Sequence, residues 1–500
     1  MTSFAVIRTV RFNEGIDMKR NLREVGTIVC LGFGIVVSLA VVERVAAKPN
    51  ILIITTDQQF ADAMSCVGSK WLKTPAMDSI AKNGVRFHNA YVNNPVCLPQ
   101  RYTWYTGRLP CTRRLADENN KPIISLGNQA KKGGYLTAYF GKWHIQDKTF
   151  SNKEKDKRYA GFDINQGGKD ATMTQAAVTF LSEKHKQPFL AVVSYYNPHD
   201  ICEWGRKKGG WTEGITMRNG EVDINPPLDQ CPPLPDNYAI NHDEAEAVTI
   251  RRSQEANGSP GAQKMAMKFT KDEWRQYRWA YYRMVELVDG HIAKLLQALK
   301  DNGLAENTVI IFTSDHGDGI GTHRWHQKSI LYDESCRVPF IISYPGKKRK
   351  NETDDHLIST GIDLMPTVSD IAGVKMPADP YFGKSVLPFV LDADSKASAH
   401  AYVVTEAEVG ISKWDSFHGR SVRSPKFKYH IWSKGKNREQ LFDMTNDPGE
   451  IKNLTENPKY ADILNQHRQL FADWLKKTDD TYQGLADAAK TVVGVESKCN

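Results

Sequence analysis

Residues 307–318, NTVIIFTSDHGD, hold a short run of apolar and β-branched side chains that ends in a polar, acidic tail. Apolar runs of this length are typical of strands buried on both faces of a parallel sheet. Residues 50–58, NILIITTDQ, repeat the pattern, and helical segments lie between the two runs. The alternation predicts an α/β fold with a large, mostly parallel central sheet sandwiched by helices and joined by right-handed crossovers.

The clearest helical pattern runs from Thr270 to Asn302. Thr270 and Glu273 form a capping box at its start, and Gly303 ends it. A shorter helix is predicted at 75–84. Apolar and aromatic side chains recur at helical spacing along one face of the longer helix: Tyr277, Tyr281, Met284, Val285, Val288, Ile292, Leu295 and Leu299. We interpret this stripe as a face packed in the core and not as part of a binding site.

The C-terminal part of the chain predicts a second, smaller unit. A strand at 338–344 and a helix at 362–372 complete the large sheet, and the proline-rich stretch 376–387 is the expected hinge. Short strand-like segments at 400–407, 418–432 and 439–444 predict a small antiparallel sheet. The pattern at 460–477 predicts a closing amphipathic helix. We therefore expect a C-terminal α+β subdomain of antiparallel strands with a closing helix.

The N-terminus is typical of a targeting segment. Basic residues at 18–23 precede an uncharged, apolar stretch at 26–42, and Ala46-Ala47 follow. This pattern favours a cleaved signal peptide. The alternative is an uncleaved membrane anchor, because the stretch is near the lower limit for spanning a bilayer. Either way the rest of the chain is exported, to the periplasm or the medium. The predicted division is residues 1–47 as leader or anchor, 48–380 as the large domain and 381–500 as the C-terminal subdomain.

The charge balance is mildly basic. The formal net charge is +8, and residues 1–47 hold six basic and four acidic residues, which leaves +6 for the remainder. This balance fits an anionic substrate. The sequence shows no dense stripe of lysine and arginine and no nucleic-acid-binding motif, so nucleic acid is not an expected partner.

Two polar doublets directly follow the predicted strands: Asp57-Gln58 and Asp315-His316. Ligands of doubly wound sheets bind at the carboxyl ends of strands, so the doublets are expected to meet in one metal site. Carboxylate and amide oxygens favour Ca²⁺, with Mg²⁺ as the second choice. His316 is an unusual Ca²⁺ ligand, and contact with the substrate is the alternative for it. The competing interpretation is that each aspartate caps the following helix.

Basic side chains follow other strand-like runs. Lys142 and His144 lie in GKWH, and His199 follows the apolar run at 189–195. Further polar groups crowd around residue 320: Asp318, His323, Arg324, His326 and Lys328. A divalent cation with lysines and histidines around it suits a tetrahedral oxyanion, sulfate or phosphate.

Seven cysteines follow the leader: Cys66, Cys97, Cys111, Cys202, Cys231, Cys336 and Cys499. Pairs among them are candidate disulfides in an exported protein, and Cys202 and Cys231 bracket one loop-like segment. An odd number leaves at least one thiol over. Cys97 is the candidate, because it lies between two prolines with no other cysteine at metal-ligand spacing.

The segment from Cys97 to Arg108, CLPQRYTWYTGR, resembles the type I sulfatase motif C-x-P-S-R-x-x-x-x-T-G-R, found in the alkaline-phosphatase-like superfamily. The resemblance runs from residue 49 to about residue 475, in the family's order. It includes both metal doublets, the G-K-W-H and P-H motifs, the lysine of G-x-H-x-x-x-x-K, and the C-terminal segment from Glu439 to Leu454.

The resemblance implies an alkaline-phosphatase-like fold and a sulfuric ester hydrolase. In this family the motif cysteine is oxidised to Cα-formylglycine by the formylglycine-generating enzyme, which makes Cys97 a precursor of the nucleophile. The implied metal ligands are Asp57, Gln58, the group made from Cys97, Asp315 and His316. The implied catalytic residues are Cys97, Arg101, Lys142, His144, His199 and Lys328.

The implied reaction begins when one hydroxyl of hydrated formylglycine, activated by Ca²⁺, attacks the sulfur of a sulfate ester. Arg101 and Lys142 would hold the diol. Lys328, Lys142 and His199 would neutralise the sulfate oxygens, and His316 or Lys328 would help protonate the leaving alcohol.

The second hydroxyl, assisted by His144, would then expel sulfate and restore the aldehyde. A serine or thiol has no second hydroxyl for this step. One position departs from the family: Gln100 stands where serine is usual. The cysteine, proline and arginine that conversion requires are all present, so we expect conversion of Cys97.

Two other functions compete with this interpretation. A phosphonate monoester or phosphodiester hydrolase shares the cysteine motif and the Asp-Gln doublet, but Lys142 and Lys328 favour the sulfatase. A non-catalytic binder of sulfated glycans would use the same cationic pocket with an unconverted Cys97. The expected partners are a sulfated polysaccharide or its oligosaccharides and the formylglycine-generating enzyme, with a membrane only if the leader is uncleaved.

Overall fold

The structure of this chain is a computed structural model. It describes residues 48–112, 124–145, 161–211, 214–253, 255–256, 259–260, 262–377, 381–412 and 415–493. The leader or anchor predicted at 1–47 lies outside these ranges. Among the residues that are described, no helix combines the length and apolarity needed to cross a membrane.

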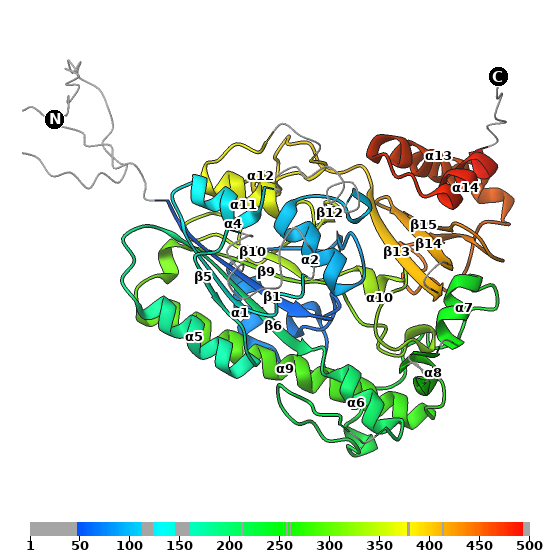
Figure 1. Cartoon of the computed structure of the whole chain (residues 1–500), viewed down its shortest axis with the longest axis horizontal. Coiled ribbons are helices and arrows are strands. Elements are labelled where there is room, and N and C mark those ends of the chain that lie inside the picture. Colours follow the sequence, from blue (N-terminus) through cyan, green and yellow to red (C-terminus); the bar gives the residue numbers. More distant parts are fainter. Residues whose placement is uncertain are drawn as a thin grey trace, which may run out of the picture. The chain divides into compact units, whose positions relative to one another are not determined.

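The central element is an eight-stranded sheet (Figure 1). Its strands in spatial order are β11 (Glu352–Asp354), β2 (Val85–Phe87), β10 (Phe340–Ser343), β9 (Thr308–Ser314), β1 (Asn50–Asp57), β6 (Phe189–Pro198), β4 (Leu136–Gly141) and β5 (Ile164–Gln166). The five strands from β9 to β5 are parallel, and β10 runs antiparallel to both β9 and β2. The predicted mostly parallel sheet is therefore confirmed.

Helices cover both faces of this sheet, as the alternation of its side chains requires. Leu52 and Ile54 of β1 face one core, and Ile51 and Ile53 face the other. The first face packs against α1 (Pro75–Lys82), α5 (Asp170–Ser182), α6 (Ile201–Lys208) and α9 (Lys271–Asp301). The second packs against α2 (Cys97–Thr106), α4 (Leu126–Lys132), α11 (Leu364–Ala372) and α12 (Leu387–Leu391).

Helix α9 confirms the pattern that predicted it. Thr270 and Glu273 form the capping box, and the predicted apolar stripe is buried. The shorter predicted helix, α1, ends at Lys82, before Gly84. A Cβ at Gly84 would lie 2.4 Å from the carbonyl oxygen of Ile342, so glycine lets the chain pass close to β10.

The C-terminal sheet contains four antiparallel strands, β13 (Val403–Ser412), β14 (Asp415–Arg423), β15 (Phe427–Trp432) and β16 (Glu439–Asp443). The segment 418–432, predicted as one strand-like run, divides into the end of β14 and β15. In the turn between them, Oγ of Ser424 accepts a hydrogen bond from the main-chain nitrogen of Phe427 at 3.3 Å. Helix α13 (Ala461–Thr478) is the predicted closing helix. A second one, α14 (Gln483–Val493), was not predicted, and both pack on this sheet.

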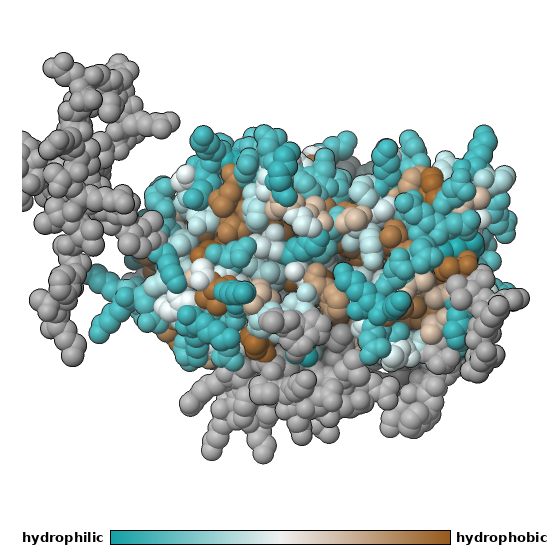
Figure 2. All heavy atoms as spheres, turned by 90° about the horizontal axis from the view of Figure 1, so that it is seen from above, coloured by the Kyte–Doolittle hydropathy of each residue, from teal (hydrophilic) through white to brown (hydrophobic). Residues whose placement is uncertain are grey.

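Smaller elements lie between these parts. They are β3 (Ala90–Tyr91), β12 (Ile358–Ser359), β7 (Glu255–Ala256), β8 (Ser259–Pro260), α7 (Glu246–Ser253), α8 (Ala262–Ala266) and α10 (Asp333–Cys336). On the face shown in Figure 2, hydrophilic side chains predominate and apolar ones form separate patches. Apolar residues exposed in this scattered way are normal on protein surfaces and do not indicate a docking face.

Candidate active site

The two polar doublets, Asp57-Gln58 and Asp315-His316, meet at the carboxyl end of the central sheet. Strands β1 and β9 are neighbours in parallel register, with Thr56 opposite Ser314. The next residues along each strand are Asp57 and Asp315, and both side chains are fully buried. The predicted juxtaposition of the doublets is therefore what the structure shows.

Arg101 holds both carboxylates from α2. Its Nε donates to Oδ2 of Asp315 at 2.8 Å, and its Nη2 donates to Oδ2 of Asp57 at 3.2 Å. Its Nη1 donates to the Lys142 carbonyl oxygen at 2.7 Å and to Oγ of Ser194 at 2.8 Å. The carboxylates are thus fixed by a buried guanidinium, in a geometry that arginine favours.

The remaining carboxylate oxygens converge on one imidazole nitrogen. Oδ1 of Asp315 lies 3.5 Å from Nε2 of His316, and Oδ1 of Asp57 lies 3.7 Å from it. Nδ1 of His316 is 2.9 Å from the Gly317 carbonyl oxygen, which can only accept a hydrogen bond. Nδ1 therefore carries a proton, and Nε2 is the ring nitrogen that faces the two carboxylates. Burial and Lys328 lower the pKa of His316, but Asp315 and Cys97 outweigh them and hold it above its usual value.

Cys97 completes this cluster from the first turn of α2. Its Sγ lies 3.1 Å from Nε2 of His316, 2.9 Å from Nζ of Lys328 and 3.9 Å from Nζ of Lys142. The ligand atoms of Asp57, Cys97, Asp315 and His316 all lie within 4.8 Å of one another. Burial raises the pKa of the Cys97 thiol, but Lys328, His316 and Lys142 together hold it well below its usual value.

The other predicted catalytic residues surround the thiol. Lys142 follows β4 and its ammonium is ion-paired with Asp57. His199 is half-buried and His144 is exposed, and both side chains lie in hydrogen-bonding range of Cys97. The pKa of Lys328 lies above its usual value, because the nearby Cys97 and acidic groups outweigh the effect of burial. The structure thus gathers four of the predicted catalytic residues around the Cys97 sulfur: Lys142, His144, His199 and Lys328. Arg101 instead holds the two carboxylates beside it.

Gln58 lies beside this cluster in a strained backbone conformation, with φ of 75°. Its main-chain nitrogen donates to Oδ1 of Asp315 at 3.1 Å. Its side-chain Nε2 donates to Oδ2 of Asp318 at 2.7 Å and lies 3.3 Å from the Cys202 sulfur. Non-glycine residues held at positive φ cluster at functional sites.

Sequence reasoning missed several groups that support the site. Ser194 supports Arg101, and the hydroxyls of Tyr277 and Tyr281 reach Asp318 and Gln58. The sequence held a signal for the two tyrosines, because a tyrosine on a buried apolar face needs a hydrogen-bond partner for its hydroxyl. Two other groups predicted near residue 320 pack against aromatic rings: His323 with Tyr332, and His326 with Tyr277.

The profile of the sulfatase family matches residues 49–374. The chain belongs to the sulfatase family. A second profile, described as N-sulphoglucosamine sulphohydrolase, C-terminal, matches residues 321–477 of this sulfatase. The chain is therefore a sulfuric ester hydrolase by family, as the resemblance of its motifs implied.

The sulfatase is similar to a Δ4,5-hexuronate-2-O-sulfatase of Bacteroides thetaiotaomicron, with 32% identity over 461 residues that cover 88% of this chain and 91% of that protein. Its fold matches the solved structure of a 2-O GAG sulfatase with a TM-score of 0.75 and 29% identity, covering 87% of this chain and 94% of that one. It also matches a phosphonate monoester hydrolase of Agrobacterium radiobacter, with a TM-score of 0.69, 22% identity, and coverage of 86% and 96%. The last likeness is one of fold alone.

Gln100, the departure from the family motif, has a structural role in this sulfatase. It is fully buried, and its Oε1 accepts hydrogen bonds from the main-chain nitrogens of Asn93 at 2.9 Å and Asn94 at 3.3 Å. Its Nε2 donates to Oγ1 of Thr360 at 3.3 Å. The side chain thus ties the start of the cysteine motif to the segment before α11.

We expect Gln100→Ser to destabilise the sulfatase, because serine is too short to reach both main-chain nitrogens. Leaving buried donors unpaired costs about 1–3 kcal/mol each, so the free energy of unfolding should fall by about that amount. Urea unfolding followed by tryptophan fluorescence measures the change. An unchanged midpoint would show that water or a rearranged loop replaces the Gln100 amide.

The disulfides considered for this chain do not form among the described residues. Cys66, Cys97, Cys111, Cys202, Cys231 and Cys336 are all free thiols. Cys202 lies beside Gln58, and the Cys231 thiol donates to the Pro227 carbonyl oxygen at 3.3 Å. The pair that brackets the 202–231 segment is therefore not a disulfide in the structure.

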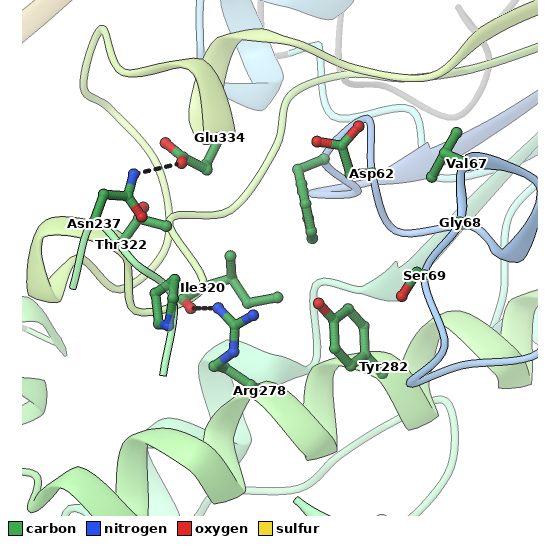
Figure 3. A pocket seen from close by; sticks show the side chains of 12 residues that line it. Asp62, Val67, Gly68, Ser69, Asn237, Arg278, Tyr282, Ile320, Thr322 and Glu334 are labelled. Atoms are coloured by element: carbon green, nitrogen blue, oxygen red, sulfur yellow. Dashed lines mark hydrogen bonds between the residues drawn. The ribbon is translucent and has the colours of Figure 1, made fainter. Parts of the chain in front are cut away.

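A cavity of about 410 Å³ is lined by residues that do not belong to the thiol cluster. It is lined by Phe60, Asp62, Val67, Gly68, Ser69, Pro235, Asn237, Arg278, Tyr282, Ile320, Thr322 and Glu334 (Figure 3). A Cβ at Gly317 would lie 1.8 Å from the carbonyl oxygen of Glu334, so Gly317, next to His316, packs tightly against a residue that lines the cavity. The cavity is separate from the thiol cluster, and the chemistry of this sulfatase is assigned to the cluster.

Proposed function

We propose that this chain is an exported sulfatase that removes sulfate esters from a sulfated polysaccharide or its oligosaccharides. Its nucleophile would be formylglycine made from Cys97, and its metal would be Ca²⁺. The observation that carries the proposal is the position of the Cys97 sulfur, which touches His316 and Lys328 and lies beside two carboxylates. Export rests on the leader-like pattern of residues 1–47.

The donor atoms fit a divalent cation. Arg101 occupies Oδ2 of both Asp57 and Asp315, which leaves each Oδ1 directed at the cluster. Nε2 of His316 faces both of them. Two carboxylate oxygens, an amide oxygen from Gln58 and an oxygen at position 97 form a mainly hard donor set, and this favours Ca²⁺ over softer metals. The imidazole is the less usual member of the set.

Formylglycine with a bound Ca²⁺ would supply an oxygen nucleophile for the sulfur of the ester. The chain's own residues would bind and orient the sulfate group. Lys142, Lys328 and His199 surround the reacting position, and their charges and N–H groups would pair with the sulfate oxygens. Because these groups are largely buried and prearranged, they would stabilise developing negative charge more strongly than water does.

Proton movement falls to the groups nearest the thiol position. The Lys328 ammonium lies 3.2 Å from Nε2 of His316 and 2.9 Å from the Cys97 sulfur, so it can donate a proton to the leaving alcohol oxygen. His144 is the exposed member of the cluster and can pass a proton to solvent when sulfate is expelled.

The proposed substrate class is a sulfated glycan that contains hexuronate. A relative with 32% identity over most of this chain acts, by its name, on Δ4,5-hexuronate-2-O-sulfate, and a solved structure with a similar fold is a 2-O GAG sulfatase. The mildly basic chain fits a polyanionic substrate.

The decisive experiment combines the mass of the tryptic peptide 87–101, from protein purified out of its native host, with turnover on sulfated glycans. We expect sulfur at residue 97 to be replaced by oxygen, and sulfate release from 2-O-sulfated unsaturated hexuronate disaccharides. An unmodified thiol together with glycan binding and no turnover would establish the non-catalytic binder instead. Faster cleavage of a phosphonate monoester than of any sulfate ester would establish the phosphonate hydrolase.

Removal of the metal should abolish this activity reversibly. Dialysis against a chelator would take away the cation that Asp57 and Asp315 would hold, and we expect a loss of roughly 10²-fold or more in kcat/KM. Added Ca²⁺ should restore it. Sulfate release by ion chromatography measures both steps, and full activity in excess chelator would refute the metal assignment.

A further inference from the structure

A buried hydrogen-bond network connects Gln58 to helix α9. Asp318 is fully buried, and three donors surround its carboxylate. Nε2 of Gln58 donates to Oδ2 at 2.7 Å, the main-chain nitrogen of Ile320 donates to Oδ1 at 2.7 Å, and the Tyr277 hydroxyl lies 3.0 Å from both oxygens. The carboxylate therefore acts only as an acceptor.

This arrangement determines which way the Gln58 amide faces. An amide has one donor end and one acceptor end, and only the donor end can face the Asp318 carboxylate. The reversed amide would place Oε1 against Oδ2 of Asp318, oxygen against oxygen. The acceptor end is consequently turned away from Asp318. The Cys202 sulfur lies beside the amide, 3.6 Å from Oε1 and 3.3 Å from Nε2.

A second tyrosine fixes the backbone of the same residue. The Tyr281 hydroxyl donates to the Gln58 carbonyl oxygen at 2.7 Å and accepts from the main-chain nitrogen of Phe60 at 3.0 Å. Tyr277 and Tyr281 are four residues apart, so their side chains lie on the same face of α9. The two hydroxyls on that face therefore stabilise Gln58 in a backbone conformation, with φ of 75°, that is unfavourable for a residue other than glycine.

We propose that Asp318, held by Tyr277, is a positioning residue that orients the Gln58 amide so that its oxygen faces the cation. Tyr281 serves the same end by fixing the Gln58 backbone. The inference rests on the metal site proposed above. The buried face of α9, interpreted from the sequence as packed in the core only, would thus also support the metal site.

The chemistry explains why such support is needed. The nitrogen of a neutral amide is a poor metal ligand, so a freely rotating glutamine would present the wrong atom in part of its conformations. Groups that orient metal ligands in this way typically contribute 10- to 100-fold to metal affinity. Asp318 is connected to the cation through Gln58, so its loss should weaken binding without removing a ligand.

The test measures the Ca²⁺ dissociation constant of the chelator-stripped, full-length protein by isothermal titration. Asp318→Ala should weaken binding roughly 10- to 100-fold. Tyr277→Phe should weaken it about 5-fold, because one hydrogen bond is lost. Asp318→Asn should fall between the parent and Asp318→Ala, because asparagine keeps one acceptor oxygen for Nε2 of Gln58.

Tyr282→Phe is the matched control. Tyr282 is also buried on α9, but it lines the cavity of Figure 3, and its loss should leave the dissociation constant unchanged. The thermal midpoint of each variant in excess chelator separates positioning from a purely structural role. Variants that lose only stability, and whose folded form binds Ca²⁺ like the parent, overturn the proposal.

The parent protein distinguishes this proposal from the proposed function. If it binds Ca²⁺ but releases no sulfate from any glycan, the function fails while the affinities of the variants still decide the positioning role. If it hydrolyses sulfate esters but binds no divalent cation, the positioning role and the metal assignment both fail, and the sulfatase activity stands.

Discussion

Replacing Cys97 with alanine is expected to abolish sulfate ester hydrolysis. Removing a nucleophile typically costs enzymes roughly 10⁴-fold or more in kcat. Alanine has no sulfur to be exchanged for oxygen, and it leaves the lysines and histidines of the cluster in place. The variant should therefore bind the sulfated substrate and fail to turn it over, which separates binding from chemistry. Steady-state sulfate release and equilibrium binding of the glycan, measured on the same preparation, test both halves.

A matched substitution controls for the loss of a thiol as such. Cys66 is a partly buried thiol whose main-chain nitrogen bonds to Asp78, away from the cluster. Cys66→Ala should retain activity within a factor of about two, since no ligand or charge near Cys97 changes. Substantial turnover by Cys97→Ala would mean that another group carries the nucleophile, and the whole assignment of the motif would have to be abandoned.

Replacing Arg101 with alanine is expected to damage both stability and activity. Arg101 is completely buried and bonds to Asp57, Asp315, Ser194 and the Lys142 carbonyl oxygen. Breaking a buried ion pair by removing one partner costs about 3–5 kcal/mol, because the remaining charge stays in a poorly solvated place. Activity should fall roughly 10²- to 10³-fold, because the carboxylates lose the group that orients them.

The comparison for this loss is Arg206→Ala. Arg206 pairs with Glu203 across one turn of α6, and both side chains are partly exposed to solvent. Exposed pairs contribute about 0–1 kcal/mol, so the unfolding midpoint in urea should barely move. If the two variants lose similar amounts of unfolding free energy, neither the burial of Arg101 nor its contact with two carboxylates adds to stability.

The sequence was sufficient for much of this fold because its strongest signals are local. The apolar runs at 50–58 and 307–318 became adjacent parallel strands, and the capping box at Thr270 starts α9 as predicted. The misjudged parts depend on tertiary contacts. One strand-like segment turned back on itself at Ser424 to form two strands. Helix α14 was missed, and it packs on the C-terminal sheet beside α13.

In the site, too, the residues with local sequence signals were predicted, and those that depend on tertiary contacts were not. Charged residues that follow strands could be assigned together, because parallel strands end at one edge of the sheet. The supporting groups were invisible for a physical reason: Tyr277 and Tyr281 satisfy the apolar periodicity of a helix, and only the fold reveals where their hydroxyls go. Likewise Gln100 looked like a defect in a motif, and the structure shows it bound to the main chain of Asn93 and Asn94.

The parallel register of β1 and β9 has a consequence for the order of folding. The two halves of the metal site come from segments 257 residues apart, joined by the hydrogen bond from Gln58 to Asp315. Contacts this distant form late, because closing so long a loop is slow and entropically costly. The proposed cation, if it binds only the folded arrangement of these ligands, would connect β1 to β9. Release of the cation would then be coupled to the separation of β1 from β9. The cation would therefore slow unfolding and have little effect on the rate of folding.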